Sequence, residues 1–355
     1  MLKKYRLILA IMMSLVILLS ACTKKEASNK PVDQKVSGEE NGKKDEDKET
    51  FEKPEKLVIR ALKGPTAMGM AKLVNDNFLS SLDSSSKVET VYDFQVLTDP
   101  QEIVKGLVEG EITVAAIPTN LAATVFNKTK GKISLLATNT LGVLYIVENG
   151  NAISSVSDLK GKTIYMTGQG ATPEYILNSI LSKAGLRPGQ DVSIEFKSEA
   201  SEVAQILATK KDVVAMLPEP FVSVSQIKNK DIKIAVDLNK EFKNIYGSDI
   251  VTGVLVAQRD FTEKYGEFIG AFLDKYKLSI GLASTDKEEF SKLVEKLDIV
   301  KAPVVLKALE RLNISYMDKK EMKESVEKYL QILFEANPKS IGGSMPSEEF
   351  YYMGK

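Results

Sequence analysis

Residues 163–173 read Thr-Ile-Tyr-Met-Thr-Gly-Gln-Gly-Ala-Thr-Pro: a short apolar run, a glycine loop, and a Thr-Pro pair before a long stretch of helical periodicity. The run predicts a buried strand. The stretch through Ala184 predicts a helix, because proline is favoured in a first turn and Gly185 suits a helix end. The loop is not a dinucleotide fingerprint, since Pro173 stands where that motif has its third glycine. A strand, a small polar loop and a helix start form the basic unit of an α/β fold.

The same unit occurs three more times along the chain. Apolar runs at 57–62, 113–117 and 213–217 are each followed by a short loop rich in Gly, Pro, Thr or Asn and then by a helical pattern, the first predicted over 66–82. Strand and helix patterns alternate up to Gln258, and the chain from Phe261 to Pro338 reads as entirely helical. We therefore expect an α/β protein with mostly parallel sheets and a helical C-terminal region.

The four loops are candidates for a ligand site. In a parallel α/β sheet such loops gather at the carboxyl edge of the strands, and helix starts there offer free backbone N–H groups and a partial positive charge. Small polar residues at a helix start also serve as ordinary caps, so any single residue of this kind has two possible roles.

The N-terminus predicts export and lipid attachment. A positive stretch containing Lys3, Lys4 and Arg6 precedes the uncharged apolar run 7–19, which is too short to span a bilayer. The run ends in Leu-Ser-Ala-Cys, which resembles a bacterial lipobox with Cys22 as the lipidated residue, and Cys22 is the only cysteine in the chain. Polar residues dominate the segment that follows, which predicts a disordered tether.

Composition excludes several classes of function. The chain has 48 basic and 48 acidic residues, and removal of the signal leaves 45 against 48, a net charge of −3. A nucleic-acid partner would need a basic excess, so none is expected. The chain has no histidine, which excludes a Ser-His-Asp site and removes the commonest metal ligand. No metal and no cofactor is expected.

Several stretches carry a family resemblance. Residues 156–164 read Val-Ser-Asp-Leu-Lys-Gly-Lys-Thr-Ile, and with 168–175, 184–186 and 212–221 they are similar to the taurine/nitrate/aliphatic-sulfonate and thiamine-pyrimidine binding family of ABC importers. The resemblance extends over roughly 57–333. It implies a two-lobed, type II periplasmic-binding-protein-like fold in which the solute lies between lobes joined by two crossovers. It also implies that the closed form docks on a membrane permease.

The resemblance implies a division of the chain and two hinges. The implied parts are a signal peptide (1–21), a tether (22–53), lobe 1 (54–142 and 251–355, including the helical C-terminal region) and lobe 2 (143–250). Gly142 and Gly253 fall near the crossovers and suit hinges, although either could be a packing glycine within a strand.

Position in the family pattern gives the implied ligand-binding residues, which lie in the four loops. They are Pro65, Thr66, Ala67, Thr119, Asn120, Gly170, Ala171, Thr172, Glu219 and Phe221. These loops contain no arginine and have one nearby cation, Lys63, whereas three acids lie near the expected cleft: Glu174, Glu219 and Asp249. Flat surfaces for stacking could come from Tyr165, Tyr175, Phe221 and Tyr246. This mixture suits a neutral or cationic heteroaromatic solute about as well as an anion.

The expected function is that of a monomeric solute-binding lipoprotein on the extracytoplasmic face of the cell membrane, feeding an ABC permease. The low histidine, tryptophan and cysteine content and the many lysines favour a Gram-positive source. One alternative is an enzyme on the same fold that uses cleft carboxylates such as Glu174 and Glu219. Another is a sensing lipoprotein whose closed form docks on a receptor. A structural or adhesive lipoprotein would not need a hinged cleft.

Overall fold

The computed structural model describes residues 52–78 and 90–354. The predicted signal segment, Cys22 and nearly all of the tether lie outside these residues. Within the described part of the chain, no helix has the length and apolar character needed to cross a membrane.

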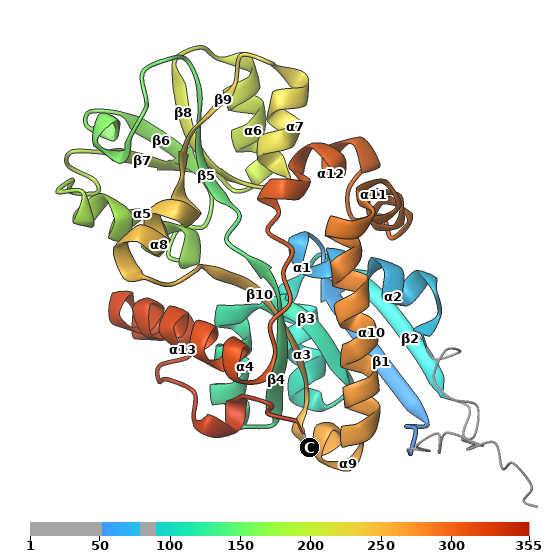
Figure 1. The fold of residues 1–355 in the computed structure, drawn as a ribbon. Coiled ribbons are helices and arrows are strands. Elements are labelled where there is room, and N and C mark those ends of the chain that lie inside the picture. The colour runs from blue at the N-terminus through green and yellow to red at the C-terminus, as the bar shows by residue number, and fades with distance from the viewer. Residues whose placement is uncertain (1–51, 79–89, 355) are drawn as a thin grey trace, which may run out of the picture. The chain divides into compact units, whose positions relative to one another are not determined.

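Ten strands form two five-stranded sheets, and helices flank both (Figure 1). The first sheet has the order β2-β1-β3-β10-β4 and the second has the order β7-β6-β8-β5-β9. We call the first sheet and its helices lobe 1, and the second sheet and its helices lobe 2. The strands of lobe 1 are β1 (Lys56–Leu62), β2 (Val91–Leu97), β3 (Val114–Pro118), β4 (Ile133–Leu141) and β10 (Val251–Gln258). Those of lobe 2 are β5 (Leu144–Asn149), β6 (Thr163–Met166), β7 (Ser193–Phe196), β8 (Val213–Pro218) and β9 (Lys233–Asp237).

In each sheet one strand runs antiparallel to the other four. In lobe 1 this strand is β10, which is antiparallel to β3 and β4, and in lobe 2 it is β5, which is antiparallel to β8 and β9. Both strands directly follow a passage of the chain from one lobe into the other. The expected α/β fold with mostly parallel sheets is therefore present, with one reversed strand inside each sheet.

The central strands are buried on both faces, which explains their uninterrupted apolar sequence. Along β3, Val114 and Ala116 face the core beside α10, while Ala115 and Ile117 face the core beside α4. Along β5, Leu144 and Ile146 join that second core, which continues across both lobes. Alternate residues thus hold different helices on the two faces of each sheet.

Helices cover both faces of each sheet. Lobe 1 carries α1 (Pro65–Met68), α2 (Ala71–Asn75), α3 (Pro100–Glu109), α4 (Thr119–Thr129), α9 (Arg259–Lys264), α10 (Gly266–Thr285), α11 (Lys287–Lys296), α12 (Ala302–Ala308) and α13 (Lys319–Ala336). Lobe 2 carries α5 (Thr172–Lys183), α6 (Ala200–Thr209), α7 (Phe221–Lys228) and α8 (Leu238–Tyr246). Short 3-10 turns are η2 (Val156–Leu159), η3 (Leu309–Arg311), η4 (Pro338–Ile341) and η5 (Glu348–Phe350).

Two predictions about helices were wrong. The helix expected over 66–82 is broken after α1, because the hydroxyl of Ser279 in α10 donates to the Gly69 carbonyl at 2.6 Å and accepts from the Leu73 N–H at 3.0 Å, in place of the helical bond between these two groups. The last residues of the expected helix lie outside the described chain. The C-terminal region is also not entirely helical. Residues 313–317 run extended along the free edge of β4, where Leu141 N–H donates to the carbonyl of Asn313 and Ser315 N–H donates to that of Asn139.

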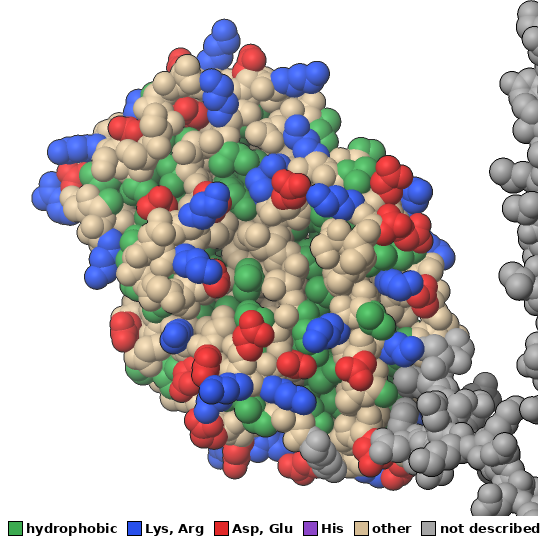
Figure 2. Space-filling view, in the orientation of Figure 1, with side chains coloured by type: hydrophobic (Ala, Val, Ile, Leu, Met, Phe, Trp, Pro, Cys, Tyr) green, Lys and Arg blue, Asp and Glu red, His purple; other side chains and the backbone are tan. Residues whose placement is uncertain are grey.

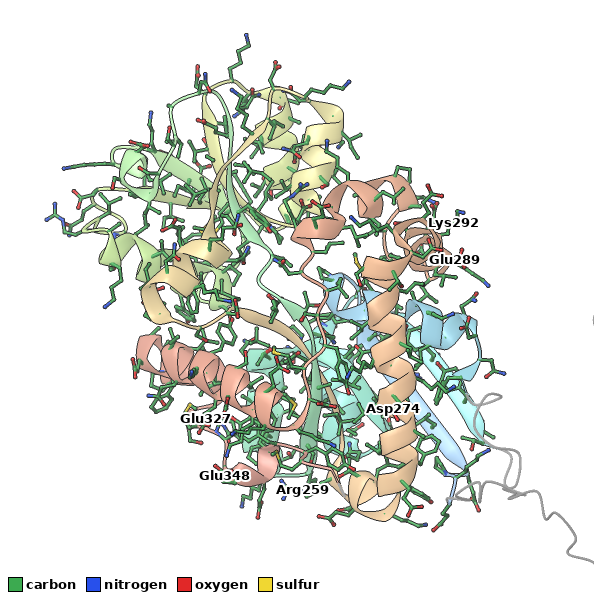
Figure 3. The ribbon with its side chains drawn as sticks, in the orientation of Figure 1. Arg259, Asp274, Glu289, Lys292, Glu327 and Glu348 are labelled. Carbon is green, nitrogen blue, oxygen red and sulfur yellow. The ribbon has the colours of Figure 1, made fainter. Side chains whose placement is uncertain are left out.

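The C-terminal tail is fixed to lobe 1. Arg259 at the start of α9 donates from its two terminal nitrogens to the carboxylate and the carbonyl of Glu349, each at 2.7 Å. Lys323 of α13 pairs with Glu348, and Figure 3 shows Arg259, Glu327 and Glu348 on the same side of lobe 1. The tail thereby covers one end of β4, where Tyr351 bridges Leu135.

The chain passes between the lobes at two points. One passage joins β4 to β5 at Gly142, and the other joins α8 to β10. Neither Gly142 nor Gly253 has a positive φ, and a Cβ at either would overlap a neighbour: the Asn239 side chain at Gly142, and Asn139 and Thr66 at Gly253. Close packing accounts for both glycines, so their role as hinges stays a prediction.

Gly253→Ala tests the packing interpretation. Its Cβ would lie 2.5 Å from Cγ2 of Thr66 inside a buried region, so we expect a loss of about 1–3 kcal/mol in the free energy of unfolding. Chemical denaturation of the solute-free protein measures this loss. The matched control is Gly270→Ala in α10, where nothing lies within 4 Å and the change should stabilise by about 0.5–1 kcal/mol. Unchanged stability with impaired lobe closure in Gly253→Ala would favour a hinge instead.

Candidate functional site

A cavity of about 300 Å³ lies between the two lobes, beside the points where the chain passes from one to the other. Its walls come from the carboxyl ends of β3, β6 and β8, from the two passages, from the starts of α4 and α5, and from one residue of α13. The lining residues are Pro118, Asn120, Val143, Leu144, Thr167, Ala171, Thr172, Pro173, Ile176, Met216, Pro218, Ile250, Thr252 and Tyr329. This volume suits one small molecule.

Two helix starts meet at the cavity from opposite lobes. Helix α4 of lobe 1 begins at Thr119 and helix α5 of lobe 2 begins at Thr172, and neither start has a side-chain cap. The hydroxyls of Thr119 and Thr172 are enclosed, and neither makes a hydrogen bond within the described part of the chain. The site thus holds unused hydroxyl groups beside two helix ends that each carry a partial positive charge.

None of the lining residues is charged, and most are apolar. The polar lining residues are Asn120, Thr167, Thr172, Thr252 and Tyr329. Two helix starts, each equivalent to roughly half a positive charge, together match about one negative charge. The cavity can therefore hold a small solute with a polar or singly charged head and an apolar body.

The structure brings together only some of the residues expected to bind a ligand. Asn120, Ala171 and Thr172 line the cavity, and Thr119 and Gly170 are their direct neighbours. Asn120 is also held by the C-terminal tail, since its amide lies 3.4 Å from the carbonyl of Ser340.

The first predicted loop lies elsewhere. Pro65, Thr66 and Ala67 belong to α1, on the face of lobe 1 covered by α10 (Figure 1), and none of them lines the cavity. Thr66 is 5% exposed and donates to the carbonyl of Leu62 at 2.9 Å. Ligand contact by this loop stays a prediction, because its side chains are engaged in the packing of lobe 1.

Glu219 and Phe221 also lie away from the cavity lining. Glu219 is fully buried at the start of α7, and one carboxylate oxygen accepts hydrogen bonds from Nε of Arg311 at 2.6 Å and from the hydroxyl of Ser223 at 3.1 Å. Its other oxygen accepts from the Ser223 N–H at 3.1 Å. Arg311 belongs to η3 of lobe 1, so this ion pair joins the lobes. Burial raises the pKa of Glu219, while the Arg311 guanidinium acts in the opposite direction.

The three acids expected near the cleft, which include the enzymatic pair Glu174 and Glu219, are separately engaged. Glu174 accepts from the Gly170 N–H at 2.6 Å, Glu219 is held by Arg311, and Asp249 pairs with Lys243 at 3.0 Å. No carboxylate lines the cavity. Within the described residues, no cluster of Asp, Glu or Cys could hold a metal ion.

A hydrogen-bond chain links α13 of lobe 1 to the glycine loop of lobe 2. The amide of Asn337, just after α13, donates to the hydroxyl of Tyr175 at 2.6 Å, and that hydroxyl donates to the carbonyl of Gly170 at 2.7 Å. Tyr175 therefore positions the loop before α5 and does not line the cavity. The other proposed stacking residues, Tyr165, Phe221 and Tyr246, do not line it either.

Sequence reasoning missed Tyr329, which is the aromatic residue that lines the cavity. It lies on α13 among the buried residues Met322, Val326, Leu330 and Leu333. This spacing is that of an ordinary core-facing stripe, so the pattern carries no sign of a ligand contact.

A second hollow of about 640 Å³ opens between α10, α11 and the extended segment 313–316. Lys277 and Lys287 line it, but Lys287 pairs with Glu310 at 3.1 Å and Lys277 lies over the Tyr316 ring. It contains none of the predicted residues, and the helix start that reaches it, that of α11 at Lys287, is capped by the Asp286 side chain. The cavity between the lobes is the better candidate site.

Charge on the molecular surface fits a small-molecule partner. Figure 2 shows Lys and Arg side chains interspersed with Asp and Glu over the face in view, without a broad patch of one sign. The face in view therefore shows none of the basic patches that bind nucleic acids.

Comparisons with known proteins identify related folds. A family profile described as "ABC transporter, phosphonate, periplasmic substrate-binding protein" matches residues 75–300. No curated protein sequence matches the chain. A crystal structure of an ABC transporter from Parabacteroides distasonis is similar with 24% identity and a TM-score of 0.70, covering 84% of this chain and 99% of that one.

Two further structures share the fold at lower identity. The periplasmic aliphatic sulphonate binding protein SsuA from Escherichia coli has 17% identity and a TM-score of 0.67, with 85% of this chain and 94% of that chain covered. The periplasmic nitrate-binding protein NrtA from Synechocystis PCC 6803 has 14% identity and a TM-score of 0.56, with 81% and 84% covered. These likenesses confirm the expected periplasmic-binding-protein-like fold.

Arg311→Ala tests the ion pair between the lobes. The change leaves a buried carboxylate without its cation, so we expect a loss of about 2–3 kcal/mol in the free energy of unfolding near neutral pH. Burial already raises the pKa of Glu219 in the wild type, and loss of the Arg311 guanidinium should raise this pKa further. The loss of stability should therefore grow as the pH rises from the wild-type pKa of Glu219 toward the higher pKa in the variant, and shrink as the pH falls toward the ordinary glutamate value of about 4.3.

The control for this experiment is an exposed ion pair. Arg187 is 70% exposed and pairs with Asp191 at 2.7 Å within lobe 2, so Arg187→Ala should cost less than about 1 kcal/mol. Denaturant unfolding of both variants across the acidic range measures the difference. Equal small losses in the two variants would show that Glu219 and Arg311 do not hold the lobes together.

Proposed function

Because the chain belongs to the family of periplasmic substrate-binding proteins of phosphonate ABC transporters, we propose that it captures a small, singly charged solute in the cavity between its lobes. The observation that carries this proposal is the meeting of two uncapped helix starts at a cavity without charged side chains. A sulfonate or nitrate-like anion fits this site, because its one negative charge matches the two helix ends. The sulphonate-binding and nitrate-binding proteins of the same fold support this choice.

The apolar walls indicate what the rest of the solute resembles. Val143, Leu144, Ile176, Met216 and Ile250 offer hydrocarbon surface beside the polar groups of Asn120 and Thr172. A short alkyl chain behind the anionic head would use this surface. A neutral pyrimidine could pack against the same walls, but it would bring no negative charge to the partial positive charges of the helix ends.

The protein delivers this solute to a permease while attached to the membrane through a lipid on Cys22. The support is in the sequence, where a short uncharged apolar run ends in Leu-Ser-Ala-Cys and a polar tether follows. A tethered monomer on the extracytoplasmic face would stay close to its permease. An enzymatic role gains no support from the cavity, whose lining includes no acid or base.

A thermal-shift and calorimetric panel of the mature protein tests the solute. We expect ethanesulfonate to bind more tightly than nitrate, which lacks an alkyl chain, and more tightly than methylphosphonate in alkaline buffer, where methylphosphonate is doubly charged. A solute at 100 times its dissociation constant should add about 2.7 kcal/mol of stability. Preferential binding of a neutral pyrimidine would contradict an anionic solute. If no solute of the panel bound, the proposed function itself would be refuted.

A pair of threonine variants locates the site in the same experiment. Thr172→Val removes the enclosed hydroxyl at the start of α5 and should weaken ethanesulfonate binding about tenfold. Thr209→Val is the matched control, because its hydroxyl bonds to the carbonyl of Gln205 within α6, away from the cavity. Equal affinity in the two variants would place the solute elsewhere.

Cys22→Ser tests the anchor. The variant should remain an unprocessed precursor without a lipid, because a thioether to the diacylglycerol cannot form. Mass spectrometry of the membrane fraction after palmitate labelling measures this. A labelled Cys22→Ser protein would contradict attachment at Cys22.

A further inference from the structure

Tyr329 is the contribution of the C-terminal helix to the cavity. Helix α13 supplies one lining residue, whereas the other lining residues come from the sheets, the passages and the starts of α4 and α5. Tyr329 is only 2% exposed, and its ring packs edge-on against Phe242 of α8 with the ring centres 6.1 Å apart. Packing against both α13 and the opposite lobe therefore fixes the position of the ring.

Among the described residues no hydrogen bond reaches the hydroxyl of Tyr329, and its oxygen is not one of the fully enclosed polar atoms, so it remains accessible to a small molecule. Burial raises the pKa of this phenol, which keeps the group protonated and able to donate. Because Tyr329 lines the cavity, its accessible hydroxyl is available to a solute there. The packing of the ring against Phe242 does not use the hydroxyl, and a phenylalanine would pack in the same way.

We propose that the Tyr329 hydroxyl donates a hydrogen bond to the polar head of the bound solute, so that α13 determines specificity together with the starts of α4 and α5. This inference rests on the proposed function of the cavity. Recognition then draws on three separate parts of the chain: Asn120 in the first half of lobe 1, Thr172 in lobe 2, and Tyr329 in the C-terminal region. The hydroxyl favours solutes with several acceptor atoms on the head, of which some face the helix starts and one more faces Tyr329.

Tyr329→Phe removes one oxygen and keeps the ring. Because the hydroxyl has no partner in the solute-free protein, the melting temperature without solute should stay the same or rise. The affinity for ethanesulfonate should fall about tenfold, as expected for one hydrogen bond to a charged group. A variant that merely loosened the fold would lower the melting temperature as well, so the two measurements separate binding from stability.

Tyr351→Phe is the matched control. Tyr351 is also buried, at 6% exposure, and its enclosed hydroxyl also has no hydrogen-bond partner, but it lies beside Phe350 in the tail and outside the cavity. The same atom is lost, so affinity for ethanesulfonate should not change. Isothermal titration calorimetry of the wild type and both variants compares the three proteins directly.

The outcomes distinguish this inference from the proposed function. Wild-type affinity in Tyr329→Phe would refute the hydrogen bond, while solute binding by the wild type would leave the proposed function intact. Equal losses in Tyr329→Phe and Tyr351→Phe would also refute it, since the effect would then not be specific to the cavity. A wild type that binds no member of the panel would refute both.

Discussion

The passage of the chain between the two sheets is the constraint on which the site depends. Because β5 and β10 enter their sheets as reversed strands, the carboxyl ends of β3, β6 and β8 meet beside the passages. The helices that follow these strands therefore begin at a common place. Two helix starts of like charge repel each other, and an anion between them removes that repulsion. The topology thus brings two partly positive helix starts to one cavity without any basic side chain.

The chain after residue 300 connects the two lobes on both sides of the passages. On one side Arg311 of η3 reaches the buried Glu219 of lobe 2. On the other side Asn337 holds Tyr175, and Tyr329 packs against Phe242. The extended segment 313–317 connects the two sides along the edge of β4. A region that reads as a helical appendage in the sequence therefore closes both sides of the lobe contact.

Sequence patterns predicted the fold well where one local signal was sufficient. Buried strands such as β3 and β8 appear as apolar runs, and the start of α5 appears as Thr-Pro after a glycine loop. The break after α1 could not be predicted, because it depends on contact between Gly69 and α10, about 200 residues later. The segment 313–317 has no pattern of its own, since it takes its conformation from the edge of β4.

The same distinction applies to the site. The place of Asn120 and Thr172 beside the cavity was predictable, because a helix start after a strand end is a local signal and such starts gather at one edge of a parallel sheet. Glu219 was expected at the cleft from its position in the family pattern, and no local pattern shows its partner Arg311, which is 92 residues away in the chain. Tyr329 shares the spacing of the core residues around it. Only the three-dimensional structure separates it from them. The family profile matches this chain up to residue 300, before Arg311, Tyr329 and Asn337. With the role proposed for Tyr329, exchange of that one side chain would change which solute is held, while the part of the chain that matches the family profile stays the same.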